Sequence, residues 1–411
     1  MNNILSELSK RGLLFQFTGD QLDLNCHLET ERTVYIGFDP TSDSLHIGSL
    51  LPLITLKRFK DCGHKIIVLI GGATGSIGDP TGKNCVRNQL SDAVLTHNVE
   101  QIINQIDSLI SPNIVRNNIA WWSSMNLLNF FTNIGSKFSV NKMLSLMSVK
   151  SRMESETGIT FQEFSYPIFQ AFDFTVLKQN DDCSIQLGGS DQWGNISVGI
   201  DLGHKMGLEQ MFGITFPLLT KSDGTKFGKT ESGNIWLDSN KTPVFDFYNF
   251  WINVSDDDVE SLLKMLTFIP VDEINDIVDE HKQFPHLREA QKILAAHMTQ
   301  FVHGDNNLEL CVSISNKLFS DELLSTEEFL FLIDSNVPSC YVNRHVNIDL
   351  CELMLTLPSV NSKGEAMRLI KQNAISIKGE KVTSRNIDLG TGEQFFLLKR
   401  GKKEFLVIEV N

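Results

Sequence analysis

Five consecutive apolar residues, residues 66–70, run directly into a glycine-rich loop at residues 71–78. Such an uninterrupted run is typical of a strand that is buried on both faces of a parallel sheet. The predicted strands are residues 33–38 and 65–70, and the residues between them have the apolar spacing of a helix. Strand, helix and strand with short connections indicate a right-handed crossover unit. We therefore predict an α/β domain with a parallel sheet over residues 30–215.

A third strand is predicted at residues 184–187, where it ends in Gly188-Gly189, and a helix follows from Asn195. Open parallel sheets bind ligands outside the carboxyl ends of their strands. The unusual polar and glycine-rich segments of this chain gather at these predicted ends. We therefore expect a ligand site there.

The charge of the 411 residues is distributed unevenly. The net charge of −14 would by itself argue against a nucleic-acid partner, but residues 351–411 hold ten Lys and Arg against seven Asp and Glu. The acidity is concentrated in residues 251–334, with 17 acids and 5 bases, inside a region that is predicted to be helical. The net charge of the whole chain therefore averages over an acidic region and a basic region.

Residues 351–411 are predicted to form a small α+β unit. Ser362 and Glu365 are a candidate capping box for a helix that continues to Lys371. Two short strands are expected around Ile375 and Val382, followed by a hairpin over residues 394–410.

Composition and spacing exclude several classes of protein. The seven cysteines contain no CxxC pair, which indicates neither a zinc finger nor a disulfide scaffold and fits a reducing cytosol. The longest apolar runs are too short to span a bilayer. The N-terminal segment carries early acids and no apolar signal core, so we expect no secretory or transit peptide, no membrane association and a cytoplasmic location.

Two segments have features of phosphate binding. Residues 37–41 and the following His46-Ile-Gly-Ser49 lie where a strand ends and a helix begins, and a helix N-terminus offers free N–H groups to phosphate. Residues 221–230 place Lys226 and Lys229 in a loop that misses the P-loop glycine spacing by one residue. Taken alone, the first segment is more often an ordinary helix start, and the second is more often an exposed basic loop.

Three further segments offer polar groups to a small ligand. The loop at residues 71–80 contains Asp79, whose carboxylate could hold an ammonium group, although a flexible turn is an equal alternative. Residues 186–195 suit ribose hydroxyls, with a structural turn as the alternative. Tyr166, Gln170 and Asp173 share one face of an aromatic-rich helix, where buried polar groups need partners, so a core network is the alternative.

Together and in this order, the five segments are specific enough to indicate a protein family. The chain resembles the bacterial-type tyrosyl-tRNA synthetases, which are class I aminoacyl-tRNA synthetases, over nearly its whole length. The family signatures written HIGH and KMSKS correspond to residues 46–49 and 226–230. Tryptophanyl-tRNA synthetases share this architecture, but the Gly-Phe-Asp-Pro-Thr and Ser-Asp-Gln-Trp-Gly segments look tyrosyl.

The resemblance implies a succession of domains. These are a Rossmann-like parallel-sheet catalytic domain at residues 1–217, a signature-loop connector at 218–243, an α-helical anticodon-arm domain at 244–335, a linker at 336–350, and an α+β RNA-binding domain at 351–411 that resembles one of a small-subunit ribosomal protein.

The resemblance also implies partners and a reaction. Tyrosine would react with ATP to form tyrosyl-adenylate and pyrophosphate, and the tyrosyl group would then pass to the 3′ end of tRNA(Tyr). Mg²⁺ would accompany the ATP, and no metal held by the protein is expected. The family is dimeric, and the aromatic stretch at residues 119–138, which includes Trp121 and Trp122, offers apolar surface for a homodimer unless it is all core.

Three sets of site residues are implied by matched position. Tyrosine would be bound by Tyr35, Asp79, Tyr166, Gln170, Asp173 and Gln192. ATP would be bound by Asp39, His46, Gly48, Ser49, Gly189, Asp191 and Lys229. The catalytic set that meets the phosphates would be Thr41, His46, Lys83, Arg87, Lys226 and Lys229.

One residue departs from the family pattern. The first signature usually ends in a second histidine, whereas this chain has Ser49. That departure favours an alternative, a catalytically weakened tRNA-binding paralogue, while the intact tyrosine and lysine sets favour an active ligase. A generic nucleotide-binding transferase would use the same segments without a preference for tyrosine.

Overall fold

The computed structural model describes residues 3–81, 90–156, 158–225, 227–230, 233–320, 322–335, 337–343, 348–389, 392–401 and 404–411. The chain forms two compact units, Met1–Leu237 with Ser255–Ala290 and Asp238–Val254 with Gln291–Asn411. Within the described ranges, no helix combines the length and the apolar character that crossing a membrane requires.

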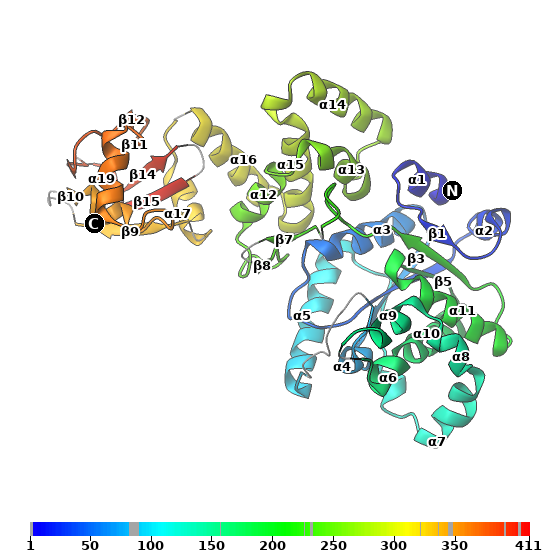
Figure 1. The fold of residues 1–411 in the computed structure, drawn as a ribbon. Coiled ribbons are helices and arrows are strands. Elements are labelled where there is room, and N and C mark those ends of the chain that lie inside the picture. Colours follow the sequence, from blue (N-terminus) through cyan, green and yellow to red (C-terminus); the bar gives the residue numbers. More distant parts are fainter. Residues whose placement is uncertain are drawn as a thin grey trace. The chain divides into compact units, whose positions relative to one another are not determined.

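The first unit is built on a six-stranded sheet (Figure 1). Its strands, in spatial order, are β1 (Gln16–Phe17), β6 (Phe212–Phe216), β5 (Cys183–Gly189), β2 (Thr33–Phe38), β3 (Lys65–Ile70) and β4 (Ile114–Asn117). All neighbours are parallel except β1, which is antiparallel to β6. The predicted α/β class is confirmed, and β2 and β3 have the expected bounds. Strands β1, β4 and β6 were not predicted, because such short segments lack the long apolar run of β3.

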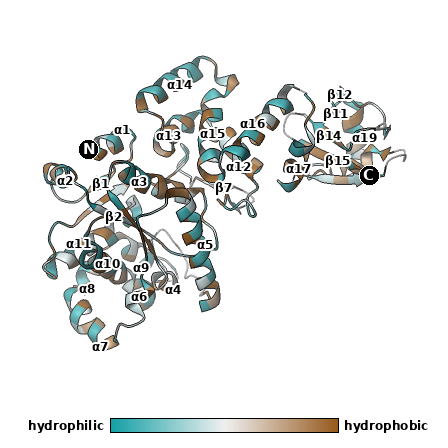
Figure 2. Ribbon diagram, turned by 180° about the vertical axis from the view of Figure 1, so that it is seen from behind, coloured by the Kyte–Doolittle hydropathy of each residue, from teal (hydrophilic) through white to brown (hydrophobic). Residues whose placement is uncertain are grey.

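Helices cover both faces of this sheet (Figure 1). Helices α3 (Leu50–Asp61) and α5 (Asp92–Ile110) belong to the connections from β2 to β3 and from β3 to β4, which step toward one edge. Helices α10 (Phe161–Asp181) and α11 (Trp193–Lys205) belong to connections that step the other way, so right-handed crossovers place them on the opposite face. Figure 2 shows the strands between them as largely hydrophobic.

Strands β2 and β5 are neighbours in the sheet, and the chain leaves them in opposite directions, from β2 toward β3 and from β5 toward β6. In open α/β sheets, the crevice at such a reversal, outside the carboxyl ends of the strands, is where ligands bind. The topology alone therefore points to the ends of β2 and β5.

Residues 255–290 join the first unit through buried arginines. The helices here are α13 (Asp256–Leu266) and α14 (Val271–Gln283). Arg11 donates to the carbonyl oxygens of Thr267 (3.1 Å) and Ile269 (2.7 Å), and Arg58 also donates to Thr267 O. Our predicted helical domain at residues 244–335 includes this segment, whereas in the structure the segment packs with the first unit. The domain boundaries given above remain predictions.

The second unit combines helices with a small sheet. Its helices are α12 (Val244–Ile252), most of α15 (Glu289–His303), α16 (Asp305–Ser320), α17 (Thr326–Asp334), α18 (Leu350–Met354) and α19 (Lys363–Lys371). Its five-stranded sheet has the order β12 (Glu380–Lys381), β11 (Ile375–Ile377), β14 (Phe395–Arg400), β15 (Glu404–Val410) and β9 (Ser339–Val342). Leu398, Leu406 and Ile408 of the sheet pack in one core with Met354 and Ile370 of the helices.

Two details of this unit differ from expectation. Strand β9 lies inside the predicted linker and pairs in parallel with β15. Ser362 Oγ accepts the backbone N–H of Glu365 as predicted, but the Glu365 carboxylate accepts from Asn361 N rather than from Ser362 N. The side chain of Ser362 therefore caps the helix as predicted. The reciprocal bond of the capping box, from Ser362 N to the Glu365 carboxylate, is wrong, because Asn361 N makes it instead.

The remaining elements are short. They are α1 (Ile4–Lys10), α2 (Gln21–His27), α4 (Thr74–Ile77), α6 (Ile119–Trp122), α7 (Leu127–Asn129), α8 (Val140–Leu144), α9 (Met147–Met153), β7 (Lys229–Thr230), β8 (Gly233–Asn234), β10 (Ile348–Asp349) and β13 (Asn386–Ile387). There are also 3₁₀ turns at η1 (Ile47–Ser49), η3 (Gly135–Lys137), η4 (Ser190–Gln192) and η5 (Pro285–Leu287), and a π-helical turn at η2 (Phe130–Ile134).

Candidate active site

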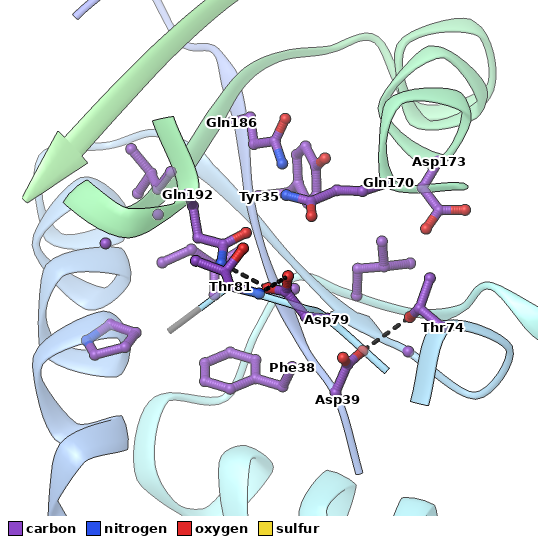
Figure 3. A pocket seen from close by; sticks show the side chains of 18 of the residues that line it. Tyr35, Phe38, Asp39, Thr74, Asp79, Thr81, Gln170, Asp173, Gln186 and Gln192 are labelled. Carbon is purple, nitrogen blue, oxygen red and sulfur yellow. Dashed lines mark hydrogen bonds between the residues drawn. The ribbon is translucent and has the colours of Figure 1, made fainter. Parts of the chain in front are cut away.

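A cavity of about 320 Å³ lies at the carboxyl ends of β2 and β5, where the topology placed it (Figure 3). Ten of the predicted site residues line it: Tyr35, Asp39, Gly48, Ser49, Asp79, Tyr166, Gln170, Asp173, Gly189 and Gln192. Three polar atoms on its wall, Tyr35 Oη, Thr81 Oγ1 and Gln186 Oε1, are buried without a hydrogen-bond partner among the described residues. Buried polar atoms are nearly always paired, so these three mark a place that is built for a polar ligand.

Helix α10 supplies three of the lining residues from one face. It begins at a capping box, in which Thr160 Oγ1 accepts from Glu163 N and the Glu163 carboxylate accepts from Thr160 N. Arg152 pairs with the same carboxylate over 2.9 Å. These contacts fix the start of the helix, so the spacing of four and three residues brings Tyr166, Gln170 and Asp173 to the cavity, as predicted.

Asp173 is 1% exposed and accepts three hydrogen bonds. The indole N–H groups of Trp121 and Trp122 donate to Oδ1 over 2.7 and 2.8 Å, and Asn118 Nδ2 donates to Oδ2 over 3.0 Å. Burial raises the pKa of the Asp173 carboxyl to about 6, although these three donors act to lower it. Asp173 therefore carries a negative charge above about pH 6 although it is almost completely buried.

Tyr35, on β2, lines the same cavity as Asp173 (Figure 3). The side chain is 1% exposed, and its ring packs on Phe174 with centroids 5.2 Å apart. Burial, and then the charge of Asp173, raise the pKa of the Tyr35 phenol well above its usual value, so the phenol keeps its proton. A hydroxyl donor and a carboxylate acceptor thus serve the same cavity.

Asp39 lies at the end of β2 and is held from two sides. Tyr166 Oη donates to its Oδ2 over 3.0 Å, and Thr74 Oγ1 donates to its Oδ1 over 2.8 Å. The glycine-rich loop makes this possible, because a β-carbon at Gly71 would lie 2.1 Å from Asp39 Oδ1 and 2.3 Å from Thr74 Oγ1. Asn118 Nδ2 donates to Thr74 Oγ1 over 3.1 Å as well as to Asp173, so one amide connects both carboxylates.

Asp79 anchors a second network on the other wall of the cavity. Its Oδ2 accepts from Gln192 Nε2 over 2.8 Å, and its Oδ1 accepts from Thr81 N over 2.9 Å (Figure 3). Asn195 Nδ2 donates to the side-chain oxygens of both Gln192 and Gln170, over 3.1 and 3.0 Å. Since Asn195 is 2% exposed, it fixes which way both glutamine amides face.

The first signature segment is built around a histidine cap. His46 Nδ1 accepts from Gly48 N over 3.0 Å, so the neutral ring carries its proton on Nε2 and can donate there. A β-carbon at Gly48 would lie 2.8 Å from the imidazole Cε1, which explains the glycine at this place. His46 and Thr41 are exposed and do not line the cavity.

Residues 235–237, which follow the second signature segment, run beside the first signature. Ile47 N donates to Ile235 O over 3.0 Å, Leu237 N donates to Leu45 O over 2.9 Å, and His46 forms a bridge with Trp236. Gly228 has a φ of 90°, and a β-carbon there would lie 2.6 Å from Ile47 Cγ1. The backbone therefore brings the two predicted signatures together, 180 residues apart in sequence.

Ser49 and Asp191 complete the described part of the predicted site. Ser49 lines the cavity and precedes α3 without a side-chain cap bond. Asp191 is exposed and outside the cavity lining, but a β-carbon at Gly189 would lie 2.5 Å from its Oδ1, so the glycine makes room for this carboxylate. Lys83, Arg87, Lys226 and the side chain of Lys229 lie outside the described residues.

Comparisons with known proteins agree with this arrangement. Residues 28–320 match the family model described as tRNA synthetases class I (W and Y), and residues 329–408 match that of a tyrosine–tRNA ligase SYY-like C-terminal domain.

The chain belongs to the class I tRNA synthetase family.

Individual relatives of this class I synthetase extend over the whole chain. Tyrosine–tRNA ligase 1 of Vibrio parahaemolyticus is 43% identical over 416 residues, which cover 99% of this chain and 98% of the relative. The protein of the same name from Bacillus subtilis is 42% identical and covers 99% of both chains. A C-terminally truncated mitochondrial tyrosyl-tRNA synthetase from Aspergillus nidulans has a similar crystal structure, with a TM-score of 0.70, 32% identity and coverage of 78% of this chain and 95% of that chain.

Sequence reasoning missed the partners of the site carboxylates in this synthetase. Asn118, Thr74 and Asn195 were not predicted as partners, and Trp121 and Trp122 were interpreted only as apolar surface or core. That interpretation is incomplete, because both indoles donate to Asp173. A buried aspartate on an aromatic helix requires donors, and the indoles at 121 and 122 were the signal that could have identified them.

Proposed function

We infer that this chain is a tyrosine–tRNA ligase, which activates L-tyrosine with ATP and transfers the tyrosyl group to the 3′ end of tRNA(Tyr). The observation that carries the inference is that one buried cavity is lined both by the carboxylate of Asp173 and by the hydroxyl of Tyr35, which has no hydrogen-bond partner among the described residues. The names of the full-length relatives from Vibrio parahaemolyticus and Bacillus subtilis support the same activity.

In this proposal the phenol of the substrate donates to Asp173 and accepts from Tyr35. Phenylalanine would leave the Tyr35 hydroxyl and the last acceptor position of Asp173 unpaired, which is the strongest way for a site to reject an analogue that lacks a hydroxyl; tyrosyl-tRNA synthetases are a well-known example. The substrate ammonium would contact Asp79, Tyr166 and Gln170, and Gln192 would lie near the substrate carboxylate.

The reaction needs no nucleophile from the protein. A carboxylate oxygen of tyrosine attacks the α-phosphorus of ATP, the bond to pyrophosphate breaks, and tyrosyl-adenylate forms. A hydroxyl of the terminal tRNA ribose then attacks the carbonyl carbon, AMP leaves, and the hydroxyl proton passes to solvent. Catalysis then depends on orienting the reactants and on stabilising charge at the phosphates.

The remaining predicted residues are proposed for the nucleotide. Asp39, Gly48, Ser49, Gly189 and Asp191 would contact the adenosine, and Mg²⁺ would arrive with the phosphates of ATP. The phosphate contacts are assigned to Thr41, His46, Lys83, Arg87, Lys226 and Lys229. The Nε2 proton of His46 supports its part in this assignment, because it can be donated to a phosphate oxygen.

The basic residues of 351–411 are proposed to contact tRNA phosphates, in a cytoplasmic protein.

A homodimer is also proposed. Five large apolar side chains in one stretch of the first unit are at least half exposed: Leu127, Leu128, Phe131, Val140 and Met147. Sedimentation at micromolar concentration is expected to give the mass of two chains, and a clean monomer with full charging activity would contradict the dimer.

The test of the function is exchange of labelled pyrophosphate into ATP, with tyrosine, phenylalanine and tryptophan compared. Tyrosine should support exchange and the other two should not, and Asp173→Ala should abolish it. A generic nucleotide-binding transferase would show no preference for tyrosine. No exchange with retained tRNA binding would select the weakened paralogue, which only Ser49 favours.

A further inference from the structure

The carboxylate of Asp173 has its acceptor positions almost filled. Trp121 and Trp122 are consecutive residues, yet both donate to the same atom, Oδ1, over 2.7 and 2.8 Å. Each carboxylate oxygen has about two lone-pair positions, so the two indoles fill Oδ1. Asn118 fills one position on Oδ2. Among the described residues, a single acceptor position of this carboxylate is left, and it lies on Oδ2.

We infer that Trp122 is a positioning residue for tyrosine recognition, which closes the second position on Oδ1 and leaves Oδ2 as the one place where a substrate phenol can donate. The inference rests on the proposed function, because the phenol is that of the tyrosine substrate. It extends that function by naming a residue that sets specificity without touching the substrate.

The two tryptophans are held by different parts of the molecule. Trp121 packs against the sheet core that contains Tyr35, Ile67 and Phe174. Trp122 packs against Phe169 and Phe172 of α10, with ring centroids 4.2 and 5.1 Å away, and against Phe130 at 6.0 Å. The orientation of the Trp122 N–H is therefore set mainly by the two closer rings of α10, and the ring of Phe130 contributes less because it lies farther away.

The charges around Asp173 make its ionised form depend on each hydrogen-bond donor. Asp173 is faced by Tyr35 from β2 and by Tyr166 from α10, both uncharged, and by Asp39, whose negative charge raises the pKa of Asp173 beyond what burial does. The indole and amide N–H groups are what lower that pKa. Without the N–H of Trp122, the carboxylate would be a weaker acid and would offer a second, misplaced acceptor position on Oδ1.

The experiment compares Trp122→Phe with Phe130→Leu in the full chain. The first keeps an aromatic ring and removes the N–H, while the second weakens the packing of Trp122 and keeps the N–H. Tyrosine-dependent and phenylalanine-dependent pyrophosphate exchange are measured from pH 5 to 9, with thermal unfolding of each variant as a check on folding.

In Trp122→Phe the acid limb of kcat/KM for tyrosine should move to higher pH by about one unit, because a donor to the ionised form is lost. KM for tyrosine should rise roughly tenfold at pH 7 while kcat changes much less, and the preference for tyrosine over phenylalanine should fall by roughly the same factor. Phe130→Leu should leave the acid limb and the preference where they are.

If Trp122→Phe does not fold, replacement of residue 122 by benzothienylalanine removes the N–H with almost no change in shape. An unmoved acid limb and an unchanged tyrosine preference, in a variant that folds, would overturn the inference and leave the proposed function intact. An equal shift in Phe130→Leu would overturn it too, since packing would then explain the effect. Absence of tyrosine-dependent exchange in the unaltered protein would overturn the proposed function together with this inference.

Discussion

Tyr166 donates its phenol proton to Asp39 Oδ2 over 3.0 Å, across a gap of 127 residues in sequence. The contact joins a residue assigned to the substrate ammonium with one assigned to the nucleotide. Burial raises the pKa of the Tyr166 phenol well above its usual value, and the charge of Asp39 adds to this, so the proton stays on Tyr166. The hydroxyl is therefore a fixed donor that orients Asp39.

Tyr166→Phe should consequently impair both substrates. Removing a hydrogen bond to a charged group is expected to cost roughly 1.5–3 kcal/mol, which corresponds to a fall of about 10- to 100-fold in kcat/KM for pyrophosphate exchange. KM should rise for tyrosine and for ATP, because Asp39 loses its orientation. A change in KM for tyrosine alone would contradict the role of Tyr166 in holding Asp39.

A β-carbon at residue 71 is expected to disrupt the cavity. In Gly71→Ala the added carbon would lie 2.1 Å from Asp39 Oδ1 and 2.3 Å from Thr74 Oγ1, so one of these side chains must move. Exchange activity should fall by roughly two orders of magnitude, since small displacements of positioning groups have effects of that size. Gly194→Ala is the matched control, because its nearest neighbour, Leu146 Cδ2, would be 3.6 Å away. Equal activity of the two variants would contradict the argument.

Much of this site followed from local sequence patterns. The apolar run of β3 and the glycines after β3 and β5 are local signals, and parallel strands bring their carboxyl ends to one edge. The spacing of Tyr166, Gln170 and Asp173 needed only the helical period. These are the features for which residues close in sequence determine the geometry.

The partners of Asp173 needed the tertiary fold. Asn118, Trp121 and Trp122 lie 51–55 residues before it in sequence, and no periodicity connects a turn after β4 with the middle of α10. Tryptophan is also ambiguous, because its ring favours burial while its N–H needs an acceptor. The apolar interpretation of these residues considered only the ring.

The raised pKa of Asp173 should appear in the stability of the protein. In the unfolded chain an aspartate titrates near its ordinary value of about 3.9, whereas burial raises the pKa of folded Asp173 to about 6. Between these pH values the folded protein binds a proton that the unfolded chain does not bind. Protonation thus favours the folded state, and stability falls as the pH rises through this window.

Asp173→Asn cannot titrate and serves as the reference. The free energy of unfolding of the unaltered protein, relative to that of the variant, should decrease by about 2 kcal/mol between pH 4 and pH 7. Urea titrations at pH 4, 5, 6 and 7 measure the difference. A difference that is the same at all four pH values would show that Asp173 is not the group responsible.

Arg11 is expected to stabilise the first unit. The residue is 3% exposed, and its guanidinium donates to the carbonyl oxygens of Lys264, Thr267 and Ile269 over 3.1, 3.1 and 2.7 Å. It also pairs with Glu7, one turn earlier in α1. Arg11→Met would keep the apolar stem but remove the ion pair with Glu7 and the hydrogen bonds to all three carbonyl groups, of which Thr267 O keeps its bond from Arg58.

Loss of the donor from such a buried network is expected to lower the free energy of unfolding by about 3–5 kcal/mol, measured by urea titration. Lys10→Met removes a neighbouring exposed charge and should change the free energy by less than about 0.5 kcal/mol. Since Arg11 lies outside the cavity lining, pyrophosphate exchange per folded molecule should stay within about threefold of the unaltered protein when measured well below the unfolding transition. A loss of activity without a loss of stability would mean that Arg11 acts on the site rather than on the fold.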